Sequence, residues 1–270
     1  EGEFRLAQTA WIIPPAEVRQ AVRPTVRGLE MVEEILAGGP AQGSVVVRVT
    51  FRNITDRPSY HTLDHHAVGG ITYRDVWVGM AVDADVGASE DDLVTYFPSL
   101  DMAVTFDADF RESTFSTDWR ERPGLVGLRV LEHPVGTSVR LNAWPRHLDW
   151  QAEGLRAISS SRGEPERTGW RWLSATQTVL SNHASAQIGH APSTPADYRM
   201  SAAAGPLTLA PGEAATVTLA VVFAAPEPGT FTSGMAVPAG EPGDLGRQIY
   251  HIGSGLRAEA VAAEALAARP

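Results

Sequence analysis

The stretch that decides the fold is "GPLTLAPGEAATVTLAVVFA", residues 205–224, which predicts a strand, a tight turn and a second strand. Pro211 fixes the backbone torsion that begins a turn, and Gly212 accepts the positive torsion that completes it. The second strand alternates apolar residues with small or polar ones, so one of its faces is expected to point into a core. The side chains expected on that face are Val217, Leu219, Val221 and Phe223.

The same alternation occurs in "SVVVRVTFRN" (residues 44–53) and in "DVWVGMAVD" (residues 75–83). The inward faces expected from it are Val45, Val47, Val49 and Phe51 in the first, and Val76, Val78, Met80 and Val82 in the second. Further short strands are expected at residues 93–97, 102–110, 125–132, 138–144 and 169–174. Many short strands without intervening helices predict an all-β fold, an antiparallel β-sandwich of the jelly-roll or immunoglobulin-like type.

The chain is expected to form one structural unit with three parts. Residues 1–43 form an N-terminal extension that packs on the sandwich, residues 44–240 form the sandwich core, and residues 241–270 form a helical tail. Within the extension, "GLEMVEEIL" (residues 28–36) fits either a strand or a helix. Strong helix formers in "GLRAEAVAAEALAAR" (residues 255–269) predict a short C-terminal helix. The polar segments 146–167 and 181–198 are expected to be long loops.

The net charge and the absence of cysteine limit which partners and which reactions are expected of this chain. The 270 residues carry a formal net charge of -10, and such an acidic chain repels nucleic-acid phosphates and anionic lipids. The chain contains no cysteine, which excludes disulfides, thiolate metal sites and cysteine nucleophiles. Lysine is absent and arginine, alanine, glycine and proline are abundant, as expected of a GC-rich bacterial coding sequence. Because of the acidic net charge, nucleic acid is not expected as a partner.

The start of the sequence is expected to be that of a processed or excised chain. The sequence begins at Glu1 and lacks a basic and then apolar leader, as expected of a processed or excised chain from which an export signal has been removed. No apolar run in it reaches the length that crosses a bilayer.

Five carboxylates follow the predicted strand at residues 75–83, in "DADVGASEDD". Oxygen ligands and a sharp turn at Gly87 suit a hard cation such as calcium. The candidate calcium ligands are Asp83, Asp85, Glu90, Asp91 and Asp92. A regular calcium loop would place ligands where Gly87 and Val94 stand. A solvated turn with aspartates capping backbone amides therefore remains an alternative, as does a pair of catalytic carboxylates. No cofactor other than calcium is expected.

A histidine cluster lies in "SYHTLDHHAVGG", residues 59–70. His61 and His65 would share a helix face that suits a transition metal, with His66 beside them. Pro58 and the two glycines that follow argue against a helix, and the glutamate of a zinc-hydrolase signature is missing. The cluster therefore fits either a metal site or a loop or interface.

Four of the seven tryptophans, Trp144, Trp150, Trp170 and Trp172, lie near the central loop. They fit core packing, a protein interface or a platform on which a sugar stacks. If the chain were a hydrolase, His147, Asp149 and Trp150 would be the residues to inspect. No nucleophile-elbow or phosphate-loop motif occurs, so the sequence predicts a protein that is not an enzyme.

Three blocks occur in order: "DVWVGMAVDADVGASEDDLVTYF", "PGLVGLRVLEHP" and "DYRMSAAAGPLTLAPGEAATVTLAVVFA". Together they resemble an uncharacterised group of bacterial exported or cell-surface β-sandwich proteins, with an Asp-x-Asp-x-Gly turn, a following Asp-Asp pair and a Gly-Pro-x-x-Leu-Ala-Pro-Gly hairpin. The resemblance implies an extracytoplasmic location, in the periplasm or at the cell surface. The expected function is a structural or accessory subunit that binds other envelope proteins. The alternative is a carbohydrate-binding or adhesive module that uses calcium.

Overall fold

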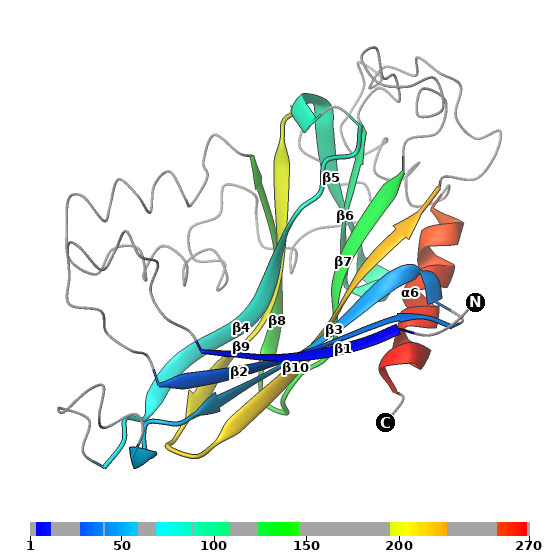
Figure 1. The fold of residues 1–270 in the computed structure, drawn as a ribbon. Coiled ribbons are helices and arrows are strands. Elements are labelled where there is room, and N and C mark those ends of the chain that lie inside the picture. Colours follow the sequence, from blue (N-terminus) through cyan, green and yellow to red (C-terminus); the bar gives the residue numbers. More distant parts are fainter. Residues whose placement is uncertain are drawn as a thin grey trace.

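The computed structural model describes residues 4–11, 28–39, 41–58, 69–87, 89–107, 124–145, 195–225 and 253–268 (Figure 1). Within these residues the protein consists of two antiparallel β-sheets, two short 3-10 helices and one α-helix, α6. The predicted all-β class is therefore confirmed. The predicted C-terminal helix is also present, as α6, Ser254–Ala267. The strand predicted at residues 169–174 lies outside the described residues.

The larger sheet has seven strands in the order β1-β2-β3-β10-β7-β6-β5. Their bounds are Phe4–Trp11, Leu29–Gly38, Ala41–Asn53, Ala214–Ala224, Leu125–Glu132, Met102–Asp107 and Asp92–Phe97. The segment that fitted either a strand or a helix is thus strand β2, paired with β3 along its length.

The smaller sheet has three strands in the order β4-β9-β8. Their bounds are Tyr73–Asp83, Tyr198–Leu209 and Ser138–Pro145. Gly79 is opposite Ala203 in the β4–β9 pair, and a Cβ added at Gly79 would collide with the backbone carbonyl of Ala202. A glycine at this position therefore allows β4 to lie close to β9.

The turn at Pro211 and Gly212 is confirmed, and Gly212 has a φ of 82°. However, β9 belongs to the smaller sheet and β10 to the larger one, so these strands do not pair. The expected hairpin is therefore wrong in its pairing. Local turn chemistry determines that the chain reverses, but the partner of each strand is chosen by long-range contacts. The turn carries the chain from one sheet to the other.

One apolar core lies between the two sheets. Val47 and Val49 of β3, Val78 of β4 and Val217 and Leu219 of β10 all contribute to it, so the predicted inward faces of these strands are confirmed. Phe223 was also expected to point inward, but it is 45% exposed. That expectation is wrong because the core between the sheets does not extend to the C-terminal end of β10.

A second core lies on the other face of the larger sheet, where α6 packs, as Figure 1 shows. Val46 of β3 and Ala220 and Val222 of β10 meet Leu256 and Ala260 of the helix there. Strands β3 and β10 are therefore buried on both faces along this half of their length, which is why residues 45–47 of β3 and 219–222 of β10 are continuously apolar.

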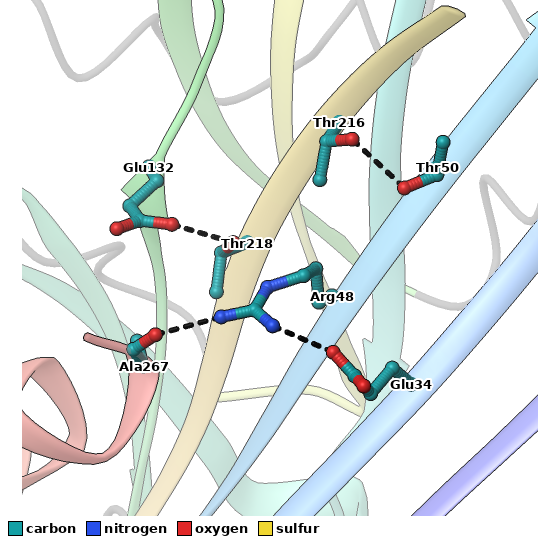
Figure 2. Close-up of polar contacts among 7 residues, drawn as sticks. All are labelled: Glu34, Arg48, Thr50, Glu132, Thr216, Thr218 and Ala267. Carbon is teal, nitrogen blue, oxygen red and sulfur yellow. Dashed lines mark hydrogen bonds and ion pairs between the residues drawn. The ribbon is translucent and has the colours of Figure 1, made fainter. Parts of the chain in front are cut away.

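Beyond the C-terminal end of α6 the same face of the sheet becomes polar (Figure 2). Arg48 of β3 donates to the carbonyl of Ala267 at 2.7 Å and to Glu34 of β2 at 2.6 Å. A cation at the C-terminus of a helix is favourable because the final carbonyls carry partial negative charge. Next to Arg48, the hydroxyls of Thr50 and Thr216 are 2.8 Å apart.

A buried asparagine forms hydrogen bonds with the segments that connect the two sheets. Asn53, at the end of β3, donates through its amide nitrogen to the carbonyls of Ile71 at 2.7 Å and Leu209 at 2.9 Å. Its amide oxygen accepts the hydroxyl of Thr55 at 2.7 Å. Its backbone carbonyl accepts the N–H of Gly212 at 2.8 Å. Through its side chain and its backbone carbonyl, this one residue ties the end of β3 to the end of β9 and to the turn before β10.

Candidate functional site

The carboxylates that follow β4 lie where several strand ends meet. Strand β4 ends at Asp83, β5 begins at Asp92, β6 ends at Asp107, and Asp197 immediately precedes β9. Asp83 is opposite Arg199 in the β4–β9 pair, and Asp92 is opposite Asp107 in the β5–β6 pair. We call this region the acidic end, and its members are Asp83, Asp85, Asp91, Asp92, Asp107 and Asp197.

Three of these carboxylates form a close group, and one arginine contacts two of them. Oxygen atoms of Asp83, Asp85 and Asp197 lie within 4.8 Å of one another. Arg199, whose side chain is 13% exposed, donates to Asp83 at 2.7 Å and lies 3.8 Å from Asp197. The guanidinium partly neutralises the group, and a hard cation could take the same place, because carboxylate oxygens are the ligands that calcium prefers.

The other part of the acidic end is a buried pair of carboxylates. Asp92 and Asp107 are fully buried and directly opposite each other. The pKa of Asp92 is raised to about 9: burial is the main cause, the neighbouring charges of Asp85, Asp107 and Asp91 act in the same direction, and the hydrogen bond from the Val86 amide acts against them. That amide lies 3.3 Å and 3.4 Å from the two carboxylate oxygens. At neutral pH Asp92 therefore holds a proton.

The structure brings two of the five predicted calcium ligands together and places the other three apart from them. Asp83 and Asp85 come together, whereas Glu90 is exposed and Asp91 and Asp92 belong to the neighbouring 3-10 helix and strand β5. Sequence reasoning missed Asp107, Asp197 and Arg199. Asp107 ends β6 and Asp197 immediately precedes β9, but only the tertiary structure shows that Asp107 lies opposite Asp92 and that Asp197 lies close to Asp83.

A groove of about 580 Å³ lies far along β9 from the acidic end, beside the turn before β10. Buried Ala215, Leu209 and Thr218 line it together with more exposed polar side chains from the ends of β7, β9 and β10. The polar and charged lining residues are Glu132, His133, Thr208, Glu213, Thr216 and Thr218. Sequence reasoning identified the turn in this region but did not predict a binding site there.

Hydrogen bonds hold the polar walls of the groove in place. Glu132 accepts the Thr218 hydroxyl at 3.0 Å, as Figure 2 shows. Glu213 accepts the backbone N–H of Ala210 at 2.7 Å. Nδ1 of His133 lies 2.8 Å from the hydroxyl of Thr137. Each of these side chains is therefore oriented before any ligand arrives.

The remaining predicted site residues are not placed by the described structure. His61, His65, His66, His147, Asp149, Trp150, Trp170 and Trp172 lie outside the described residues. Trp144 is on β8 opposite Arg199, but its side chain is not described. A different tryptophan forms an aromatic contact, because the guanidinium carbon of Arg140 lies 5.8 Å from the ring centre of Trp77. That distance fits a cation–π interaction.

No protein-family model matches the chain, and no curated protein is significantly similar to it. Within the described residues, no helix is both long enough and apolar enough to cross a membrane.

Proposed function

We propose that the chain is a non-catalytic, exported β-sandwich of the jelly-roll or immunoglobulin-like type, which serves as a structural or accessory subunit at the bacterial cell envelope. Its work is to bind another protein. The observation that supports this proposal is the groove at the end of β7, with its buried floor and polar walls held by hydrogen bonds. A groove that combines buried apolar residues with oriented polar side chains has the ingredients of a protein interface.

The acidic charge agrees with a protein partner. A net charge of -10 repels nucleic acids and anionic lipid surfaces, but it speeds association with a basic protein surface. The resemblance to exported envelope proteins supports the location and the accessory role.

Photo-crosslinking in the native source tests the proposal. Ala214 is exposed and lines the groove, so Ala214→p-benzoylphenylalanine places a reactive group in it. Val261, 56% exposed on α6, provides the matched control with the same substitution. We expect one specific adduct from position 214 and none from position 261. Adducts of equal intensity at both positions, or none at 214 in a native extract, would count against a protein partner in the groove.

A calcium-dependent carbohydrate-binding or adhesive module is the second candidate. It is favoured by the close group of Asp83, Asp85 and Asp197. Excess calcium should then raise the melting temperature relative to chelator, and the calcium-loaded chain should be retained on a polysaccharide column. An unchanged melting curve together with passage through such columns would exclude this candidate.

A further inference from the structure

The groove lies where strand β10 extends beyond the end of its neighbour β7. Strand β10 pairs with β3 from Ala214 to Val222, but it pairs with β7 only from Thr218 to Ala224. The register between β10 and β7 shifts between Thr218 and Leu219, at the point where β7 ends with Glu132. Along residues 214–217 of β10, one edge therefore has no strand neighbour among the described residues.

This edge can accept another strand. Backbone groups of successive residues in a strand point to alternate sides, so two of the four residues 214–217 direct their N–H and C=O groups toward the groove. Their other side is occupied by regular pairing with β3, which keeps the segment extended. An extended peptide in the groove would pair with this edge of β10, in the position that β7 would occupy if it were longer. Unpaired strand edges are templates for such pairing.

The charges around the edge select a basic segment. Glu132 and Glu213 both line the groove, and the carboxylate of Asp56 lies beside Gly212 in the adjacent turn. The arginine opposite Ala214, Arg52, is 3.9 Å from Glu30 of β2, on the far side of β3 from the groove. A second copy of this acidic chain is disfavoured by like-charge repulsion.

We propose that the groove binds an extended, arginine- or lysine-bearing segment of a partner protein, which adds to the unpaired edge of β10 as a strand and places a basic side chain between Glu132 and Glu213. This inference rests on the proposed function, because it names the chemistry of the partner segment. Main-chain hydrogen bonds supply the affinity in this mode, and alternate side chains supply the specificity.

The test uses synthetic peptides on the intact chain. The probe is a fluorescent peptide of about six residues that alternates arginine and valine. Two matched peptides carry glutamate in place of arginine, or N-methyl groups on alternate backbone nitrogens. Glu132→Gln and Glu213→Gln each keep the acceptor oxygen that their hydrogen bonds use. Glu90→Gln removes an equal, exposed charge from the 3-10 helix Ser89–Asp91, away from the groove, and serves as the control.

We expect saturable binding of the basic peptide, and binding about tenfold weaker for either groove variant and for the N-methylated peptide. The Glu90→Gln chain should bind as the unmodified chain does. No binding, or binding that is indifferent to backbone methylation or to Glu132 and Glu213, overturns the inference. The proposed function fails separately, since it depends on the adduct at position 214 in the native extract. An adduct there without peptide binding would leave a protein partner in place and reject the basic added strand.

Discussion

Asp92 and Asp107 are direct cross-strand partners on β5 and β6, and both are fully buried. Like charges directly opposite each other in a sheet repel, and burial adds the cost of removing each charge from water. The pair is compatible with a folded core because Asp92, with its pKa raised to about 9, keeps a proton at neutral pH. The proton is thus part of the folded structure.

Stability should fall as the pH rises. The ordinary pKa of Asp92 is 3.8 and its folded pKa is about 9, so between these values the folded chain holds a proton that the unfolded chain has released. The free energy of unfolding therefore decreases as the pH rises across this window. The stabilisation that this proton contributes is complete only below the ordinary pKa. Asp92→Asn should flatten this slope and raise the stability at about pH 8 by about 1–3 kcal/mol.

Urea unfolding at several pH values would measure this slope. Glu90→Gln, which removes an exposed carboxylate, should leave the slope unchanged. If Asp92→Asn and Glu90→Gln gave the same slope as the unmodified chain, Asp92 would not be protonated in the folded state.

The buried side-chain amide of Asn53 should stabilise the segments that connect the two sheets. Asn53→Ala removes the donors to Ile71 and Leu209 and the acceptor for Thr55, and it leaves these buried groups without that partner. The expected loss is about 2–4 kcal/mol in the free energy of unfolding. Thr50→Val breaks a single exposed hydrogen bond to Thr216 and should cost less than about 0.5 kcal/mol. Comparable losses in the two variants would contradict the role of Asn53.

Much of the local structure follows from the sequence. Alternation in β3, β4 and β10 predicts which side chains enter the core between the sheets, since a strand with one buried face must alternate. Pro211 and Gly212 predict the turn, and the run of helix formers predicts α6. These features depend on neighbouring residues alone, which is why sequence reasoning reaches them.

The arrangement of the site depends on distant residues and could not be predicted in this way. Nothing near the turn indicates that β9 and β10 enter different sheets. The approach of Asp107 to Asp92 requires the β5–β6 register, and that of Arg199 to Asp83 requires the β4–β9 register. The groove depends on where β7 stops pairing with β10, and its register shift has no sequence signature that we recognise.

The close approach of β4 to β9 should be intolerant of a side chain. A Cβ at Gly79 would overlap the carbonyl of Ala202, whereas at Gly124 its nearest neighbour would be the carbonyl of Ala224 at 3.9 Å. Gly79→Ala should therefore destabilise the protein by about 1–3 kcal/mol. Gly124→Ala should be neutral or stabilise it by up to about 1 kcal/mol, because alanine restricts the unfolded chain. Thermal unfolding of the two variants would distinguish them, and equal melting temperatures would show that β4 can move away from β9 at no cost.

Arg199 and a calcium ion should compete for the same carboxylates. Without calcium, Arg199→Gln removes the cation that pairs with Asp83 and Asp197, and the chain should lose about 1–3 kcal/mol of stability. With excess calcium the loss should be recovered, so the rise in melting temperature between chelator and calcium should be larger in the variant than in the unmodified chain. Asp85→Asn, which removes one oxygen ligand from the group, should reduce that rise. If calcium leaves the melting temperature of the Arg199→Gln chain unchanged, the group of Asp83, Asp85 and Asp197 does not bind the ion.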